Sequence, residues 1–200
     1  MTTVSAPAPL TRPTTKRAYS TAWWGMASLI ATESMVFVVL LGAYFFLRAT
    51  SKQWPIGGIP APELRLSVPF SFVLWGSSIP IFIAEAAIRR GSQRGLRAGL
   101  AVSGLMGLAF LGYTGKDFLD LHFGWRTNAY GSIYYTIVGL HALHVIIGLG
   151  MNAIVQIKAW QGKFSAERHM SVEVFSLYWH FVDAVWIFVF SSLFLSEAIR

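Results

Sequence analysis

Long apolar runs separated by short polar segments organise most of this chain. Each run has about twenty residues or more, the length that crosses roughly 30 Å of hydrocarbon as an α-helix. In lipid such a run must be helical, because only a helix satisfies its backbone hydrogen bonds within one segment. The pattern predicts an all-α integral membrane protein with five transmembrane helices, at Ala22–Leu47, Ser67–Ile88, Ala98–Phe118, Tyr130–Ile157 and Val172–Ala198.

The segments between these runs are polar or rich in helix breakers. Lys52–Arg65 contains three prolines and two glycines, and Arg89–Arg97 reads RRGSQRGLR. Residues 1–20 are rich in Pro, Thr and Ala, so we expect a flexible tail in front of a membrane domain that covers residues 21–200. A cleaved signal peptide is the alternative interpretation, but the run Ala22–Leu47 is longer than the apolar part of such a peptide.

Composition and charge agree with a membrane location. Apolar residues make up 54% of the chain and charged residues only 12%, about half the charged share of a typical soluble domain. The net charge of +7 lies in short pieces between apolar runs, which argues against a nucleic-acid partner. Ten of the 16 Lys and Arg residues fall on the side of the N-terminal tail, so the positive-inside rule places the N-terminus in the cytoplasm and the C-terminus outside. There is no cysteine and therefore no thiolate chemistry.

Ionisable residues inside the apolar runs are the candidate functional groups. Glu33 lies about 17 Å into the first predicted helix, near the membrane midplane, where a lone charge costs at least a few kcal/mol. His141 and His144 lie at similar depth in the fourth helix, and His180 and Asp183 lie near the middle of the fifth. Within each pair the spacing is three residues, so both members share a helix face. We expect the five groups to form one interior cluster, with a hydrogen bond between His180 and Asp183.

Such a cluster has two interpretations. It could handle protons or line an intramembrane cleft. It could instead be polar packing that hydrogen-bonds helices together. Metal ligation by His141 and His144 is less favoured, because a zinc site needs at least a third protein ligand. Outside the cluster, Glu85 and Arg89 are placed to form an ion pair at the helix border.

Three stretches resemble subunit III of the haem-copper oxidases. YGSIYYTIVGLHALHVIIGL, at Tyr130–Leu149, is similar to that family's signature around two histidines. VEVFSLYWHFVDAVWIFVFSSLFL, at Val172–Leu195, is similar to its last helix, and GMASLIATESMVF carries Glu33 like the family's buried carboxylate. The likeness covers nearly all of residues 22–198. One departure is that Thr114 and Asp117 stand where the family commonly has Gln and Glu, which shortens the reach of the carboxylate.

The resemblance implies an accessory subunit that carries no haem, copper or other metal. It would pack beside the catalytic subunit I, with subunit II and small subunits in the same complex. Its five helices match the short form found in many bacterial oxidases, which implies the bacterial plasma membrane. The family role is to help sustain proton uptake and turnover of a proton-pumping terminal oxidase in aerobic respiration, and to hold phospholipid in a cleft between helix groups.

The resemblance also suggests residue roles. Glu33 would lie beside the lipid cleft, and His141, His144, His180 and Asp183 match the family's polar positions. Lys158 would meet a lipid phosphate. Trp179 and Trp186 are assigned with Lys158 to the lipid-binding positions, as residues that line packing surfaces.

Other functions stay open at this stage. Subunit III of a quinol oxidase has the same size, although the paired histidines and YWHFVDAVW look closer to cytochrome c oxidases. A subunit III-like protein associated with nitric oxide reductase is a smaller possibility. From other classes, the rivals are a free-standing proton carrier that uses Glu33 and Asp183, a haem-binding electron carrier, and a lipid-holding scaffold with no proton role.

Overall fold

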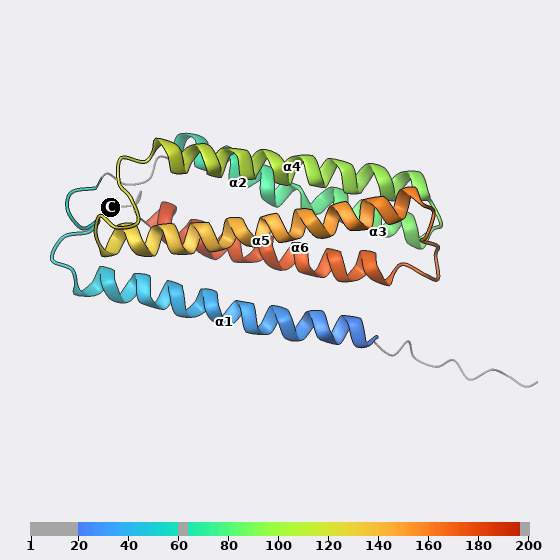
Figure 1. Ribbon diagram of the computed structural model, residues 1–200, viewed down its shortest axis with the longest axis horizontal. Helices are drawn as coiled ribbons and strands as arrows, with labels where there is room; N and C mark the ends of the chain where they lie inside the picture. The colour runs from blue at the N-terminus through green and yellow to red at the C-terminus, as the bar shows by residue number, and fades with distance from the viewer. Residues whose placement is uncertain (1–19, 60–63, 197–200) are drawn as a thin grey trace, which may run out of the picture.

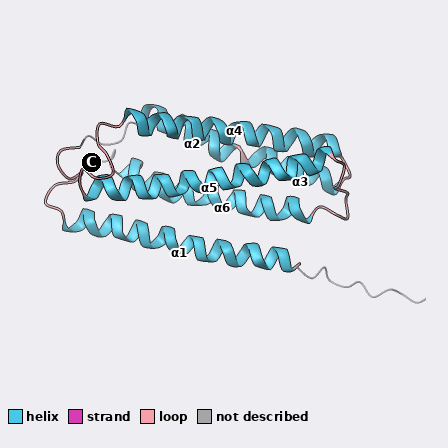
Figure 2. Cartoon of the chain, viewed as in Figure 1, coloured by secondary structure: helices cyan, strands magenta, loops and turns pink. Residues whose placement is uncertain are grey.

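The computed structural model describes residues 20–59 and 64–196, and the regular secondary structure within these ranges is helical, joined by loops and turns (Figures 1 and 2). The predicted tail falls on residues 1–19, outside the described part of the chain. The elements are α1 (Thr21–Thr50), α2 (Leu64–Gly76), α3 (Ser78–Arg89), α4 (Gln93–Asp120), α5 (Ala129–Trp160), α6 (Met170–Phe190) and a π-helical turn η1 (Ser191–Leu195).

The prediction of five transmembrane helices is confirmed. Five segments of the described chain are long and apolar enough to cross a membrane, and each contains or overlaps one predicted run. Polar side chains fix where three helices begin. Ser20, Ser92 and Asn128 each accept a hydrogen bond from a backbone N–H in the first turn of α1, α4 and α5. These N-caps satisfy donors that a helix start otherwise leaves unpaired.

Two predicted helices differ in detail from the structure. The second is not continuous, because it divides at Ser77 into α2 and α3. Pro80 follows the break, and a proline lacks an N–H and its ring clashes with the carbonyl of the fourth residue before it, here Gly76. The fifth ends as an α-helix at Phe190 and continues as η1 to Leu195, while its predicted last residues, 197–198, lie outside the described chain.

The helices form layers across a bundle (Figure 1). α4 packs against α2, α3 and α5, and α6 packs against α5, α3 and α1. α1 lies at one edge of the bundle and contacts α5 and α6 (Figure 1). Of the most apolar 18-residue stretch of α1, only about a tenth is buried, whereas 61% of the corresponding stretch in the last span is buried. The bundle is therefore organised around the last helix, with α1 attached at its side.

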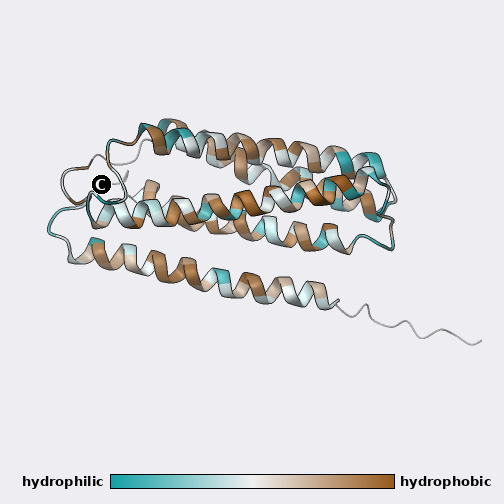
Figure 3. Cartoon of the chain, viewed as in Figure 1, coloured by the Kyte–Doolittle hydropathy of each residue, from teal (hydrophilic) through white to brown (hydrophobic). Residues whose placement is uncertain are grey.

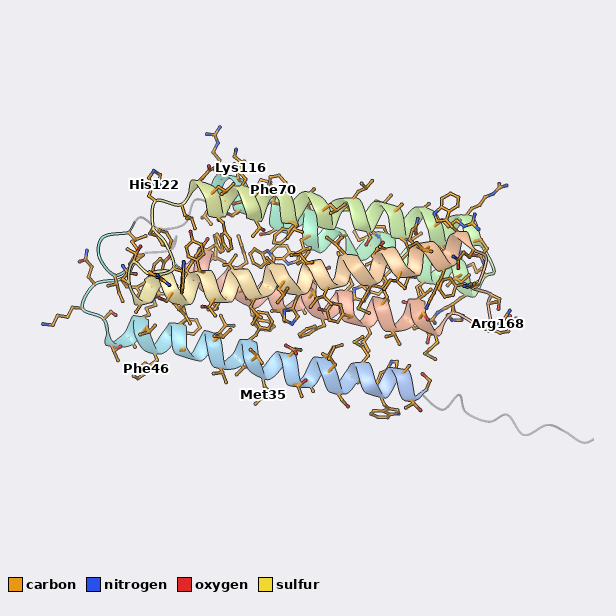
Figure 4. All side chains as sticks on the ribbon, viewed as in Figure 1. Met35, Phe46, Phe70, Lys116, His122 and Arg168 are labelled. Carbon is orange, nitrogen blue, oxygen red and sulfur yellow. The ribbon has the colours of Figure 1, made fainter. Side chains whose placement is uncertain are left out.

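The surface has the polarity of a membrane protein. Hydrophobic residues dominate the middle of the bundle, and hydrophilic ones gather near its two ends (Figure 3). Met35 and Phe46 project from α1 away from the other helices, and their exposed fractions are 63% and 67% (Figure 4). Large apolar side chains at such exposure are stable in hydrocarbon and unfavourable in water. The outer face of α1 therefore faces lipid or another membrane subunit.

Trp179 of α6 packs against three neighbouring elements. Its side chain is fully buried, and its Nε1 donates a hydrogen bond of 2.8 Å to Oγ of Ser77 at the α2–α3 break. On the other side its ring lies against glycines of α4 and α5. A Cβ atom added to Gly107 would be 2.7 Å from the indole, and one added to Gly148 would be 2.9 Å from it. The absence of side chains at Gly107 and Gly148 thus creates the space that the indole fills.

Trp186 repeats this arrangement about two turns further along α6. Its Nε1 donates to Oγ of the buried Ser71 on α2, at 2.9 Å. Its ring stacks on His141 and contacts Phe110. Hydrogen bonds between helices are useful in lipid, where apolar burial does not drive association. The two indole–serine bonds therefore fasten α6 to α2 and α3.

α3 and α4 approach each other through small residues. A Cβ added to Gly99 would lie 2.4 Å from the carbonyl oxygen of Pro80 and 2.7 Å from Cβ of Ala84. Gly95, one turn earlier, faces Ala87 in the same way. Gly95 and Gly99 are spaced as Gly-x-x-x-Gly, the pattern that permits close helix contact in membranes.

We predict that Gly148→Ala destabilises the bundle, because the new methyl group overlaps the indole of Trp179. Overpacking of this kind costs about 1–3 kcal/mol. Gly150→Ala is the matched control on the same helix, since an added Cβ there meets nothing within 4 Å. Denaturation of the purified protein in mixed micelles, followed by circular dichroism, measures both. Equal stability of the two variants would contradict the packing role of Gly148.

Candidate functional site

The five predicted interior groups do not form one cluster. The structure divides them between the α1–α5 interface, which holds Glu33 and His144, and the α3–α6 interface, which holds His180 and Asp183. His141 lies apart from both, stacked on Trp186. The expectation of a single cluster is thus wrong, because groups at one depth can still face different helices.

Glu33 and His144 form a pair across α1 and α5. Oε2 of Glu33 lies 3.3 Å from Nε2 of His144. The other ring nitrogen, Nδ1, lies 2.8 Å from the carbonyl oxygen of Leu140. A carbonyl oxygen only accepts, so Nδ1 carries a hydrogen, and the Nε2–Oε2 contact then needs one more proton, on the imidazole or on the carboxyl group. The pair lies at the edge of the bundle, where the Glu33 side chain is 34% exposed.

His141 is buried in an aromatic environment. Only 1% of its surface is exposed, and its ring stacks on Trp186 at a centroid distance of 4.6 Å. Phe37 and Phe110 pack edge-on against the same ring. Neither ring nitrogen has a hydrogen-bond partner among the described residues. His141 thus shares the Phe37 ring with His144 but has no hydrogen bond to it, and its contacts are those of aromatic packing.

His180 and Asp183 are joined through a residue that the sequence analysis did not single out. Oγ of Ser78 on α3 lies 2.9 Å from Nδ1 of His180 and donates a hydrogen bond to Oδ2 of Asp183. The predicted direct bond between His180 and Asp183 is therefore replaced by a bridge, because α3 inserts a hydroxyl group between them. Asp183 is 6% exposed, and its Oδ1 has no hydrogen-bond partner within the described chain.

Three serines of the second span face α6: Ser71, Ser77 and Ser78. Their sequence context could have identified them as residues that face the bundle interior. They are hydroxyl residues within an otherwise apolar segment that also contains a glycine and two prolines. Polar residues in a transmembrane helix usually face the bundle interior. That rule would have directed attention to the polar face of α2 and α3.

The predicted ion pair of Glu85 and Arg89 is confirmed and belongs to a larger network. It lies at the basic end of the bundle, which we define as the end that holds the connections at residues 90–92 and 161–169. Glu85 accepts from Arg89 and, at 2.9 Å, from Ser176 of α6. Arg89 also lies 3.8 Å from Glu173, whose carboxylate is 3.0 Å from Nε2 of the buried His169.

The three predicted lipid-binding residues are placed differently. Lys158 lines a pocket of about 260 Å³ at the basic end, and the rest of the lining comes from α1, α5 and α6: Ala22, Met151, Ile154, Val155, Met170, Ser171 and Val174. Trp179 and Trp186 are 0% and 2% exposed, and their indole N–H groups bond to serines. Both indoles are therefore packing residues inside the bundle and are not available to lipid.

Asp117, the departure noted above, lies at the far end from the basic connections. Its Oδ2 accepts a hydrogen bond from the hydroxyl group of Tyr134, at 3.4 Å. The hydroxyl group of Thr114 donates to the backbone carbonyl of Phe110. Both contacts lie within or between α4 and α5 and have a local structural role.

Within the described residues, no group of three or more His, Cys, Asp or Glu side chains is arranged to hold a metal ion. The polar groups instead form pairs and bridges that can share or pass protons. The fold and these sites define a class: a multi-pass membrane protein with hydrogen-bonded polar groups between its helices.

Comparison with known proteins identifies the family. A profile described as cytochrome c oxidase subunit III matches residues 7–197. A cytochrome c oxidase subunit 3 of Thermostichus vulcanus is 34% identical over 86% of this chain and 85% of its own length. One of Synechocystis is 35% identical over 86% and 74%, and a probable cytochrome c oxidase subunit 3 of Nocardia farcinica is 36% identical over 82% and 83%. The chain belongs to the subunit III family of the haem-copper oxidases.

We predict that Glu33 and His144 are energetically coupled. In a double-mutant cycle with Glu33→Ala and His144→Ala, the shared hydrogen bond should give a coupling of about 0.5–2 kcal/mol in unfolding free energy. The control cycle combines Glu33→Ala with His180→Ala, which lie at different interfaces, and should be additive. Additivity in the first cycle would show that the pair does not form in the membrane.

Proposed function

We propose that this chain is the accessory subunit III of a proton-pumping cytochrome c oxidase in a bacterial plasma membrane, with its N-terminus in the cytoplasm. The observation that carries the proposal is the family match over residues 7–197, which includes all five membrane spans. Relatives from three bacteria bear the name cytochrome c oxidase subunit 3, two of them without qualification. Their names favour cytochrome c over quinol as the electron donor.

The chain is proposed to perform no redox chemistry itself. Haem and copper would belong to partner subunits, of which subunit I is the main contact and subunit II and small subunits are further members. The side chains of this subunit support that division of labour. Its ionisable groups are arranged as Glu33–His144 and His180–Ser78–Asp183, which suit proton exchange better than electron transfer.

The subunit would support proton uptake and the stability of subunit I. The Glu33–His144 pair favours a proton role, because its geometry requires a proton between a partly exposed carboxyl group and an imidazole. The exposed apolar face of α1 supplies a surface that needs a membrane partner. A free-standing proton carrier is the alternative from another class, and it would work without partners.

The pocket beside Lys158 supports phospholipid binding. Its walls are mainly apolar side chains, which suit an acyl chain, and Lys158 supplies a positive charge for a phosphate. Basic residues at the membrane surface attract anionic headgroups by about 1 kcal/mol each. The lipid-binding role is therefore proposed for Lys158 alone among the three residues first assigned to it.

Purification through an affinity tag on this chain in mild detergent tests the proposal. We expect a haem-bearing subunit to co-purify, and the preparation to consume oxygen with reduced cytochrome c as the donor. Consumption with quinol alone would keep the family and overturn the choice of donor. A colourless chain that emerges alone and moves protons in vesicles would favour the free-standing carrier.

We predict that Lys158→Gln lowers the amount of anionic phospholipid that co-purifies with the complex, because the phosphate loses its cationic partner. Lys163→Gln is the control, since Lys163 lies at the same end of the bundle, is exposed and does not line the pocket. Mass spectrometry of extracted lipids, normalised to protein, gives the comparison. Equal lipid retention in the two variants would argue against a headgroup site at Lys158.

A further inference from the structure

Polar side chains recur at helical spacing along the seam between α3 and α6. On α6 the residues are spaced by four, three, four and three positions, and on α3 by four, three and four, so each set lies on one helix face. We call these residues the α3–α6 seam: Glu173, Ser176, His180 and Asp183 on α6, with His169 at its N-cap, and Ser78, Glu85 and Arg89 on α3, together with the aromatic Phe82. The seam runs from the basic end to the middle of the bundle.

Contacts between the two helices join successive levels of the seam. Arg89 lies against Glu173 and Glu85, and Glu85 accepts from Ser176. One turn deeper on α6, the His180 ring stacks on Phe82 with a centroid distance of 4.1 Å. His180 then contacts Ser78, which bonds to Asp183. A polar group on each turn of α6 is expensive in a membrane unless it has a use.

The outer part of the seam lies at a surface pocket. Phe82, Glu85, Ala86 and Arg89 line a pocket, and the Arg89 side chain is 57% exposed. The Glu85 carboxylate is therefore reachable from the basic surface. Ser176, its hydrogen-bond partner, lies one helical turn from His180. Protons that reach Glu85 are thus brought within one turn of the imidazole.

The inner part of the seam has the connectivity of a proton relay. The Ser78 hydroxyl group lies between a ring nitrogen and a carboxylate oxygen, so it can accept from one and donate to the other. Nε2 of His180 and Oδ1 of Asp183 have no hydrogen-bond partners among the described residues. Ser78 is therefore the connection between imidazole and carboxylate.

We propose that Ser78, His180 and Asp183 form a proton-binding site inside this subunit, which is loaded from the basic end along the α3–α6 seam. This inference rests on the proposed role of the chain in a proton-pumping oxidase and specifies a second proton-bearing position, distinct from Glu33.

The transfer within the site is balanced in atoms and charge. In one arrangement His180 is an imidazolium ion and Asp183 a carboxylate. The Nδ1–H bond of His180 breaks as an O–H bond forms on Ser78, and the original Ser78 O–H bond breaks as Oδ2 of Asp183 is protonated. The products are a neutral imidazole that carries its hydrogen on Nε2, a carboxylic acid and an intact serine. The site is neutral overall in both arrangements, which suits a low-dielectric interior.

Within the described part of the chain, the charged and titratable groups along the seam toward the basic end are Glu85 and Arg89 on α3, Glu173 on α6, and His169 at the N-cap of α6. Above Asp183, α6 continues with apolar and aromatic residues as far as Phe190. The seam therefore ends at Asp183, and the site stores a proton near the midplane without leading it across the membrane.

Infrared spectroscopy of the purified complex in membranes tests this assignment. We expect a carbonyl stretching band of a protonated, buried carboxyl group that disappears in Asp183→Asn and persists in Glu33→Gln. In Ser78→Ala the band should exchange into deuterium oxide at least about tenfold more slowly, because the relay loses the hydroxyl group that joins the imidazole to the carboxylate. Ser78→Thr, which keeps the hydroxyl group, should restore most of the exchange rate.

Two results would overturn the proposal. One is the absence, at every pH at which the complex is stable, of a carboxyl band that depends on Asp183. The other is unchanged exchange in Ser78→Ala, which would assign the serine to packing only. The readout is independent of turnover, so a failed relay with an active oxidase leaves the proposed function standing. An intact relay in a complex without oxidase activity would overturn the proposed function and leave the relay standing.

Discussion

The hydrogen bonds that Trp179 and Trp186 donate to Ser77 and Ser71 are the constraint on which the rest of this structure depends. Because lipid tails are as apolar as the helices themselves, burial alone does not specify how transmembrane helices pair. A buried indole N–H usually finds a hydrogen-bond acceptor, and each of these two finds a serine on the broken helix. Once Trp179 is fixed to Ser77, glycines on α4 and α5 are needed to make room for its ring.

The same two turns of the last helix carry both the packing residues and the residues of the proposed relay. Two turns of α6 between Trp179 and Trp186 also carry His180 and Asp183, which meet Ser78 next to the helix break. The break at Ser77 therefore serves both roles, since it directs one serine to an indole and the next to the relay. α1 is attached to the bundle in a different way. It is attached along one side, pairs Glu33 with His144 of α5, and leaves most of its apolar surface for lipid or a partner.

The sequence predicted the membrane spans well because apolar run length is a strong local signal, and the border pair Glu85–Arg89 depends only on helical spacing. It identified Glu33, His144, His180 and Asp183 as polar groups within the membrane spans but not their partners. Which face of α5 meets α1, and that Ser78 separates His180 from Asp183, depend on how whole helices rotate against each other. The break in the second span could have been predicted from Pro80, whereas the burial of Trp179 depends on how three neighbouring elements pack around it.

The most direct test of the central claim is the stability of Trp179→Phe, which keeps an aromatic ring and removes the indole N–H. Denaturation in mixed micelles, compared with Trp160→Phe at an exposed position, isolates the buried hydrogen bond. Leaving the Ser77 hydroxyl group buried without its donor, and leaving a gap in place of the larger ring, should lower the unfolding free energy by about 1–3 kcal/mol. Equal stability of the two variants would contradict the claim that indole–serine bonds organise the bundle.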